Sequence, residues 1–482
     1  MHFDLIVIGS GPAGRRAAIQ AAKLGHSTLV VEDRPRVGGA SVHTGTIPSK
    51  TLRETVLNLS GWRERGFYGL AYRVKKEIDE QDLSARLQKT LNYEVNVLEH
   101  QFMRNGVRTM AGVARFVDPH RITVTAANGD VDTCEADHFL IAVGTKPFRP
   151  GHIPFDGYGV VDSDDIVERP RVPRSLAVVG AGVIGLEYAT IFSALDVPVT
   201  IIEPRENFLE FIDREIIEEF VGELRRRGVN FRLGCRVENV EIDASGWAIA
   251  TLDDRRRIRT EMLLYAAGRV GATDDLGLDA CGLVADSRGR LSVDPKTFQT
   301  SVPHIYAAGD VIGPPSLAST SMEQGRIAAC HAFAAPMHEA PVFFPYGIYA
   351  VPEVSTIGLT EAQARAEGIP YECGIARFRE TSRGHIMGLV SGMMKMIVSL
   401  DDRRLLGVHI VGEGATELIH IGQAVMNLGG TIDYFIENTF NYPTLAEAYK
   451  IAALDAYNRM PPRSQDLPFD PPVTRAAIVA ES

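Results

Sequence analysis

The chain has 482 residues, well above the roughly 250 to 300 at which a single hydrophobic core stops growing, so we expect two or more domains. Hydrophobic residues make up 45% and charged residues 23% of the chain, which excludes a disordered or fibrous protein. The formal net charge of -11 argues against a nucleic-acid partner, because binding to a phosphate backbone depends on an excess of Lys and Arg.

Targeting signals and reactive cysteine clusters are not found in the sequence. The N-terminus begins with a strand-like stretch instead of a basic region, an apolar run and a cleavage site. Because no uninterrupted apolar run reaches about 18 residues, we expect no membrane span and a cytoplasmic location. The cysteines are far apart and form no metal-type cluster, so we predict no metal site and expect them to be reduced and structural: Cys134, Cys235, Cys281, Cys330 and Cys373.

A duplicated glycine motif predicts two nucleotide-binding units. Residues 4–14 read DLIVIGSGPAG, and residues 175–185 repeat the pattern as SLAVVGAGVIG. Each copy is an apolar run typical of a buried parallel strand, followed by three glycines and a helical stretch. A second strand follows in each copy, over 27–32 and over 199–203, which gives the βαβ order of a dinucleotide-binding unit.

Each residue of the motif has a distinct task in such a unit. The first glycine permits the tight turn, the second lets the backbone approach a pyrophosphate at the helix N-terminus, and the third allows the helix to pack closely on the strand. An acidic residue at the end of the second strand accepts hydrogen bonds from a ribose diol. Two such sites without a metal cluster indicate a pair of redox cofactors that exchange electrons. The residues predicted for these tasks are Gly9, Gly11, Gly14 and Glu32 in the first unit and Gly180, Gly182, Gly185 and Glu203 in the second.

The run GGASVHTGTIPSK at residues 38–50 resembles the redox-active segment of the flavoprotein disulfide reductases, which include lipoamide dehydrogenase and glutathione reductase. In that family two cysteines five residues apart precede Ile-Pro-Ser-Lys, and this chain has Ser41 and Thr46 at those positions. The family's His-Pro-Thr motif, whose histidine serves the thiol, is matched by a run that begins at Tyr442. Thiol exchange needs a thiolate and a partner that manages its proton, so we expect no dithiol substrate.

Further runs resemble this family along nearly the whole chain. IAVGT at 141–145 and YAAGR at 265–269 resemble the strands that close the two units. IYAAGD at 305–310 resembles the second FAD motif, whose Asp contacts the ribityl chain. LASTSMEQG at 317–325 resembles the helix whose N-terminus faces the flavin pyrimidine. The resemblance thus implies further cofactor-binding residues at Gly39, Thr46, Gly144, Gly268, Asp310, Leu317 and Ala318.

The positions at which this chain differs from the disulfide reductases resemble those of one branch of that family, the soluble, Si-specific pyridine nucleotide transhydrogenases. Runs characteristic of the branch occur at 44–53, 182–189, 315–318 and 440–444, although the branch often keeps the first cysteine. The resemblance implies the reaction NADPH + NAD+ = NADP+ + NADH, in a ping-pong cycle through bound FAD. Because only hydride moves, no general base is required.

The same resemblance assigns two catalytic residues and one specificity residue. It implies that Lys50 lies near flavin N5 with Glu187 as its partner, although the two could form a purely structural ion pair. Both nucleotides would use the site that ends at Glu203, whose carboxylate favours NAD(H) over NADP(H). Arg205, two residues further on, is expected to bind the 2'-phosphate of NADP(H), the alternative being a solvated surface side chain.

We therefore expect an α/β fold with two Rossmann-like dinucleotide-binding domains, for FAD and for NAD(P), and a C-terminal α+β interface domain. By resemblance, the interface domain pairs chains into a homodimer or a larger homo-oligomer. A Pro-rich tail follows it and is expected to be mobile. The expected boundaries are 1–147 and 269–340 for the FAD domain, 148–268 for the NAD(P) domain, 341–460 for the interface domain and 461–482 for the tail.

Two other functions fit the same sequence. One is an NAD(P)H dehydrogenase or diaphorase that passes electrons to a quinone or another acceptor, with an identical fold. The other is a non-catalytic flavoprotein that senses NAD(H) and keeps FAD as a structural element. The presence of both Lys50 and Glu187 argues against the non-catalytic function.

Overall fold

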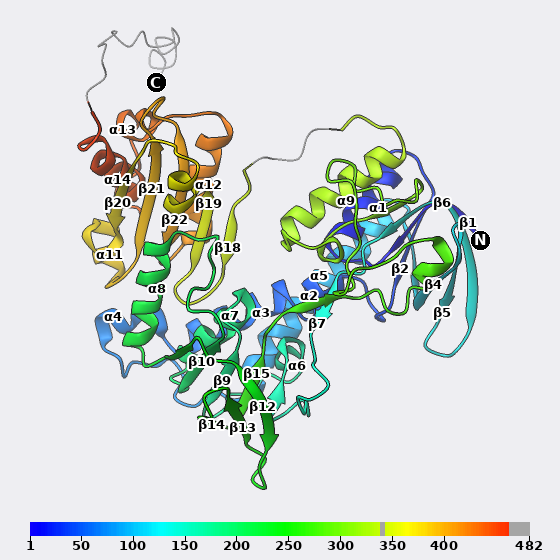
Figure 1. The fold of residues 1–482 in the computed structure, drawn as a ribbon, viewed down its shortest axis with the longest axis horizontal. Coiled ribbons are helices and arrows are strands. Elements are labelled where there is room, and N and C mark those ends of the chain that lie inside the picture. Colours follow the sequence, from blue (N-terminus) through cyan, green and yellow to red (C-terminus); the bar gives the residue numbers. More distant parts are fainter. Residues whose placement is uncertain (338–342, 462–482) are drawn as a thin grey trace.

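The computed structural model describes residues 1–337 and 343–461, which form three parts with a sheet in each (Figure 1). In Figure 1 the sheet of the N-terminal part lies at the right, the middle part at the lower centre and the C-terminal part at the upper left, while α3 and α4 extend from the N-terminal part to the lower centre and the left. The expected tail over 461–482 lies outside the described residues apart from Pro461, and so does the expected boundary between 340 and 341.

The N-terminal part is built on a seven-stranded sheet in the order β3-β2-β1-β6-β5-β4, with β17 beside β6. β1 pairs in parallel with β2 and β6, while β4, β5 and β6 form an antiparallel extension. β17 pairs in parallel with β6, so the chain returns to this sheet after the middle part. The strands are β1 (His2–Ile8), β2 (Thr28–Glu32), β3 (Arg108–Ala111), β4 (Val113–Asp118), β5 (Arg121–Thr125), β6 (Val131–Ile141) and β17 (Ile305–Ala307), and the helices are α1 (Pro12–Lys23), α2 (Gly39–His43), α3 (Thr46–Leu59), α4 (Arg65–Tyr68), α5 (Glu80–Arg104) and α9 (Ala318–Ala332).

The middle part has a parallel five-stranded sheet in the order β11-β10-β9-β15-β8. A three-stranded antiparallel sheet, β12-β13-β14, is attached to it, and a short antiparallel pair, β7 with β16, lies where the chain enters and leaves this part. The elements are β7 (Thr145–Pro147), β8 (Val160–Val161), α6 (Ser163–Glu168), β9 (Leu176–Val179), α7 (Val183–Ser193), β10 (Val199–Glu203), α8 (Arg214–Arg226), β11 (Asn230–Leu233), β12 (Val237–Ile242), β13 (Ala248–Leu252), β14 (Arg257–Thr260), β15 (Met262–Tyr265) and β16 (Arg269–Gly271).

The C-terminal part is an antiparallel sheet in the order β18-β19-β22-β21-β20, with helices packed against it. β21 is buried along its whole length, which places it at the centre of this part. The elements are β18 (Tyr346–Ile348), β19 (Val354–Gly358), α10 (Glu361–Ala366), β20 (Tyr371–Arg377), α11 (Ser382–Met387), β21 (Met393–Ser399), β22 (Leu405–Val411), α12 (Ala415–Asn427), α13 (Asp433–Glu437) and α14 (Glu447–Tyr457).

Helix α1 packs closely on α9 because small residues face each other. The buried face of α1 consists of alanine and glycine, and a Cβ added to Gly325 of α9 would lie 2.1 Å from the carbonyl oxygen of Ala13. A larger side chain at either position would push the two helices apart. This contact brings the N-terminus of α9 next to the first glycine turn.

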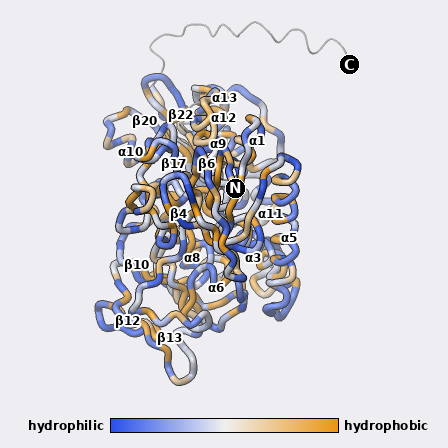
Figure 2. Tube along the Cα trace, turned by 90° about the vertical axis from the view of Figure 1, so that its right-hand side faces the viewer, coloured by the Kyte–Doolittle hydropathy of each residue, from blue (hydrophilic) through white to orange (hydrophobic). Residues whose placement is uncertain are grey.

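Helix α5 covers the outside of the N-terminal part with one apolar face. Its buried residues recur at the helical spacing of three and four, with longer steps between them: Leu83, Leu87, Val95, Leu98 and Phe102. The remainder of α5 is largely hydrophilic, as the tube in Figure 2 shows. Asp79 caps its N-terminus by accepting the backbone N–H of Asp82, which fixes where the helix begins.

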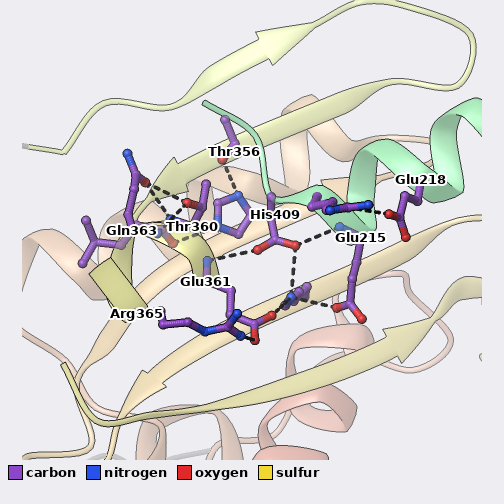
Figure 3. Close-up of polar contacts among 12 residues, drawn as sticks. Glu215, Glu218, Thr356, Thr360, Glu361, Gln363, Arg365 and His409 are labelled. Atoms are coloured by element: carbon purple, nitrogen blue, oxygen red, sulfur yellow. Dashed lines mark hydrogen bonds and ion pairs between the residues drawn. The ribbon is translucent and has the colours of Figure 1, made fainter. Parts of the chain in front are cut away.

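A buried lysine joins the middle part to the C-terminal part. Figure 3 shows two of its partners, Glu215 and Glu361. Lys395 of β21 is 1% exposed, and its Nζ atom lies 3.0 Å from Asp213, 2.7 Å from Glu215 and 2.6 Å from Glu361. Asp213 also accepts the backbone N–H of Glu361, so it bonds to two elements of the C-terminal part. An unpaired charge at this depth would be costly, and the carboxylates supply its partners.

The structure confirms the α/β fold with two dinucleotide-binding units and a C-terminal α+β part. Among the helices of residues 1–337 and 343–461, none is both long and apolar enough to cross a membrane. All five cysteines are free thiols, and only Cys373 among them is not fully buried.

Candidate active site

A cavity of about 1500 Å³ lies where the three parts of the chain meet. Its lining includes both glycine turns, the starts of α3 and α9, and Pro345, Tyr346 and Tyr349 from the C-terminal part. A pocket for one drug-sized ligand has roughly 300 to 1,000 Å³, so this cavity has room for more than one cofactor-sized molecule.

The structure brings nearly all the predicted site residues to this one cavity. Gly14 and Gly185 are the two predicted residues that do not line it. The residues that do are Gly9, Gly11, Glu32, Gly39, Thr46, Lys50, Gly144, Gly180, Gly182, Glu187, Glu203, Arg205, Gly268, Asp310, Leu317 and Ala318.

The third glycine of each motif is required for packing. A Cβ added to Gly14 would lie 1.9 Å from the carbonyl oxygen of Gly9, and one added to Gly185 would lie 2.1 Å from that of Gly180. Heavy atoms do not approach so closely, so any side chain at these positions would force the helix away from its turn. Gly14 and Gly185 therefore act on a ligand only indirectly, through the position of the helix N-terminus.

The first and second glycines shape the turns themselves. Gly9 and Gly180 have positive φ angles of 100° and 105°, and an added Cβ would lie 2.4 Å from the carbonyl oxygen of Ala142 and 2.7 Å from that of Ala266 respectively. Gly11 and Gly182 are the N-caps of α1 and α7, and an added Cβ at either would meet no atom within 4 Å. Each turn thus offers open backbone and helix N–H groups to the cavity, an arrangement suited to a pyrophosphate.

Glu32 closes the first turn from the end of β2. Its Oε2 atom accepts hydrogen bonds from the backbone N–H of Ser10, at 2.9 Å, and from the Ser10 hydroxyl. Its Oε1 atom accepts the backbone N–H of Arg34 at 3.2 Å. Burial and a hydrogen bond with Asp33 raise the pKa of the Glu32 carboxyl to about 7. These bonds hold the carboxyl at the cavity wall, where ribose hydroxyls could donate to its remaining lone pairs.

Glu203 occupies the equivalent place in the second unit. Its Oε2 atom accepts the backbone N–H of Ala181 at 2.8 Å. Its Oε1 atom accepts the Nε–H of Arg205 at 2.6 Å and the backbone N–H of Arg205 at 3.2 Å. Burial alone would raise the pKa of Glu203, but the hydrogen bonds from Arg205 and Ala181 outweigh it and hold that pKa below its usual value. Glu203 is therefore an ionised carboxylate already paired with Arg205.

Lys50 and Glu187 form an ion pair between the two units. The Nζ atom of Lys50, on α3, lies 2.7 Å from Oε1 and 2.6 Å from Oε2 of Glu187, on α7. The Glu187 side chain is 5% exposed and that of Lys50 is 26% exposed, so the lysine faces the cavity more openly. Tyr349 of the C-terminal part contacts both members of the pair. Its backbone N–H donates to Glu187 at 3.0 Å, and its ring centre lies 4.9 Å from the Lys50 ammonium.

Asp310 lies three residues after β17 and lines the same cavity as the first turn. Burial raises the pKa of Asp310, while the guanidinium of Arg269 and a hydrogen bond with Thr145 oppose this rise. The preceding Gly309 donates its N–H to Gln324 of α9 at 2.9 Å, which ties the loop to that helix. Leu317 is the N-cap of α9, so the N–H groups of the first turn of α9 point toward the same region.

The segment that resembles the redox-active one carries hydroxyl groups. The Ser41 hydroxyl donates to the carbonyl oxygen of Gly38 at 3.1 Å, and Thr46 is the first residue of α3. Tyr442 is 69% exposed, bonds to the Ser382 hydroxyl and does not line the cavity of this chain.

Two features of the site were not predicted from the sequence. One is the contact of Tyr349 with both members of the Lys50–Glu187 pair. The other is Arg236, which lines the cavity beside the second unit. Neither belongs to a motif with recognisable spacing, so only the packing of distant segments reveals them.

Comparison with known families identifies this arrangement. The family model described as pyridine nucleotide-disulphide oxidoreductase matches residues 3–325, which include both glycine turns. The chain belongs to this family. The model of the family's dimerisation domain matches residues 344–453 of the C-terminal part.

Family members of known name are similar over nearly the full length. The soluble pyridine nucleotide transhydrogenase of Mycobacterium tuberculosis is 50% identical over 460 residues, which are 95% of this chain and 98% of that protein. The soluble pyridine nucleotide transhydrogenase of Serratia proteamaculans is 41% identical over 471 residues, 95% of this chain and 99% of that protein. A solved structure, the HOCl-induced flavoprotein disulfide reductase RclA from Escherichia coli, is 25% identical, covers 94% of this chain and 99% of its own, and has a TM-score of 0.83.

These comparisons confirm the family and the branch predicted from the sequence, and with them an oxidoreductase. The match to a dimerisation domain supports a homo-oligomer. The expected Si-specificity stays a prediction.

Proposed function

We propose that this oxidoreductase moves hydride between NADPH and NAD+ by way of a bound FAD, in a ping-pong cycle. The observation that carries the proposal is the meeting of two dinucleotide-binding turns at one cavity, with the Lys50–Glu187 pair at their junction and hydroxyl side chains in place of a redox disulfide. The names of the relatives support it.

The residues of the N-terminal part fit FAD. Gly11 presents open backbone at the start of α1 for a pyrophosphate, and Glu32 is fixed where a ribose would lie. Asp310 is a partly buried carboxyl at the cavity, suited to a hydroxyl of the ribityl chain. The other proposed FAD contacts are Gly9, Gly39, Thr46, Gly144, Leu317 and Ala318. Bound FAD would supply an N5 atom that accepts hydride from one nicotinamide and delivers it to another.

The residues of the middle part would hold NAD(H) and NADP(H) in turn. The start of α7 offers Gly182 and its helix N–H groups to the pyrophosphate. Glu203 would accept hydrogen bonds from the ribose of NAD(H), and Arg205, now paired with it, would turn toward the 2'-phosphate of NADP(H). Gly180 and Gly268 complete the proposed site.

Lys50 and Glu187 would act on charge at the junction of the two sites. Hydride carries negative charge into the cavity, and a fixed ammonium favours its arrival. Glu187 holds that ammonium through both carboxylate oxygens and is itself held by the backbone N–H of Tyr349. The N-terminus of α9 also lines the cavity and would favour negative charge in the same way.

Three further expectations are part of the proposal. The FAD domain comprises 1–147 and 269–340, the NAD(P) domain 148–268 and the interface domain 341–460, a division supported by the separate sheets of the three parts. Two chains pair through the interface domain, which the match to a dimerisation domain supports. The word soluble in the names of the relatives supports the expected cytoplasmic location.

Steady-state kinetics test the proposed function. We expect the purified flavoprotein to reduce an NAD+ analogue of distinct absorbance at the expense of NADPH, with parallel lines in double-reciprocal plots, as a ping-pong cycle requires. Intersecting lines would contradict one shared site. Turnover with a quinone but not with the NAD+ analogue would favour the diaphorase function instead.

A further inference from the structure

Arg236 is a cation at the nucleotide cavity that the proposed function does not use. It lies in the turn between β11 and β12, lines the cavity and has an exposed side chain. Within residues 1–337 and 343–461 its side chain forms neither a hydrogen bond nor an ion pair. A long charged side chain without a partner at a binding cavity is available to a ligand.

The turn that carries Arg236 is bonded to the end of β10. The backbone N–H of Cys235 donates to the carbonyl oxygen of Glu203 at 3.2 Å, and that of Gly234 donates to the carbonyl oxygen of Arg205 at 3.4 Å. Cys235 is buried, which anchors the turn, while Gly234 has a positive φ of 68° that bends it. Arg236 therefore directly follows the two residues, Gly234 and Cys235, whose backbone is bonded to Arg205 and Glu203.

The charges around this turn favour an added anion. Glu203 and Arg205 neutralise each other at 2.6 Å, so this pair alone offers a phosphate no net attraction. Arg236 adds a positive charge that makes no ion pair within the described residues. Carboxylates do flank the turn, namely Glu206, Asp253 and Asp254, but none of the three lines the cavity and Asp254 is paired with Arg256. A phosphate monoester carries about -1.5 to -2 charges near neutral pH, so it needs more cation than a neutral pair supplies.

We propose that Arg236 binds the 2'-phosphate of NADP(H) together with Arg205, and that this second arginine lets a site built around Glu203 accept both nucleotides. The inference rests on the proposed function, since it assigns NADP(H) to the same cavity as NAD(H). An arginine suits this task because its planar guanidinium can bind two phosphate oxygens at once.

Calorimetric binding of two nucleotide fragments to the FAD-loaded protein tests the inference without turnover. Adenosine 2',5'-bisphosphate carries the 2'-phosphate and 5'-AMP lacks it, so their ratio isolates that group. We expect Arg236→Ala to weaken binding of the bisphosphate about tenfold or more and to leave binding of 5'-AMP within about twofold. Arg232→Ala is the matched control: it removes the same charge from an exposed residue of β11, the strand before this turn, that does not line the cavity.

Three results would overturn the inference. The first is an Arg236→Ala variant that binds the bisphosphate as tightly as the parent does. The second is an Arg236→Ala variant that loses the same affinity for both fragments. The third is a parent protein that binds the two fragments equally well. Arg236→Lys, which keeps the charge, should retain part of the bisphosphate affinity, and a loss identical to that of Arg236→Ala with a lowered melting temperature would indicate damage to the turn. Failure of the proposed function is a separate result: the parent would bind the bisphosphate through Arg236 yet not exchange hydride between NADPH and NAD+.

Discussion

The ammonium of Lys50 lies 2.6 Å from Oε2 of Glu187, and this ion pair joins the helix after the hydroxyl-bearing segment to the helix after the second glycine turn. The pair therefore spans the boundary between the two dinucleotide-binding units. Buried pairs are weak evidence of function by themselves. At this boundary, however, the lysine faces the cavity that both units share.

Replacing Lys50 tests whether its charge acts on the reaction. We expect Lys50→Met to slow flavin reduction by NADH and by NADPH on the order of tenfold or more, with FAD still bound, because a preorganised charge is lost. Stopped-flow absorbance of the flavin measures the rate. Lys89→Met, on the exposed face of α5, removes the same charge far from the cavity and should behave as the parent does. An unchanged rate of flavin reduction in Lys50→Met would mean that the ion pair has only a structural role.

Alanine at the packing glycines should separate the two sites. Gly14→Ala would place a Cβ 1.9 Å from a backbone oxygen of the first turn, and we expect it to reduce FAD content. Gly185→Ala would place one 2.1 Å from the second turn, and we expect FAD to stay while nucleotide binding weakens. Overpacking typically costs about 1 to 3 kcal/mol, and occasionally more.

Gly222→Ala is the control for these variants. This glycine lies within α8, and the nearest atom to an added Cβ is Nη1 of Arg226 at 3.6 Å. Alanine is the better helix former by about 1 kcal/mol, so this variant should be as stable as the parent or more so. FAD content, nucleotide affinity and melting temperature distinguish the three variants, and equal behaviour of all three would refute the packing argument.

Stability should fall in mild acid because of His409. Its Nε2 atom lies 2.9 Å from the carbonyl oxygen of Leu359 and its Nδ1 bonds to the Thr356 hydroxyl, as Figure 3 shows for Thr356. Burial lowers the pKa of His409 below 6.5, so the unfolded chain takes up a proton at a higher pH than the folded chain does. The free energy of unfolding should therefore decrease as the pH falls below about 6.5.

The pH dependence is best measured as a difference between variants. Chemical denaturation from pH 7.5 to pH 5 should show a shallower loss of stability for His409→Gln than for the parent, whatever the offset between them. His385→Gln, at an exposed histidine, should keep the slope of the parent. Identical slopes for the parent and His409→Gln would show that this histidine does not resist protonation.

Dithiol chemistry should be absent. Ser41 and Thr46 occupy the positions of the two cysteines, and four of the five cysteines elsewhere are buried. We expect no turnover of lipoamide or of glutathione disulfide at rates above background, and no thiolate-to-flavin charge-transfer band on reduction. Either signal would mean that a thiol from another part of the chain reaches the flavin.

The two units could be predicted from the sequence because their geometry is local. The positive φ of Gly9 and of Gly180 belongs to a turn between adjacent elements, and its residue pattern appears within a few positions. The resemblance to a family gave the partnership of Lys50 with Glu187. The resemblance did not predict the contact of Tyr349 with this pair. Tyr349 is 162 positions from Glu187 and reaches it because the C-terminal part packs against the middle part.

The contact between the middle and C-terminal parts could not be predicted from the sequence either. Lys395 is the one charged residue in β21, whose sequence MMKMIVS is otherwise almost entirely apolar and is buried at every position. Its burial depends on carboxylates from α8 and α10, which only the packed structure brings together. Contacts of this kind depend on the arrangement of whole domains and leave no periodic pattern in the sequence.

Anaerobic double mixing in a stopped-flow instrument tests the hydride exchange most directly. The FAD-loaded protein is first mixed with one equivalent of NADPH, and the bleaching of the flavin absorbance is followed; it is then mixed with excess NAD+. We predict that the flavin absorbance returns and that NADH appears in equal amount, as transfer through one shared cavity requires. A flavin that NADPH reduces but NAD+ cannot reoxidise, although a quinone can, would contradict the account.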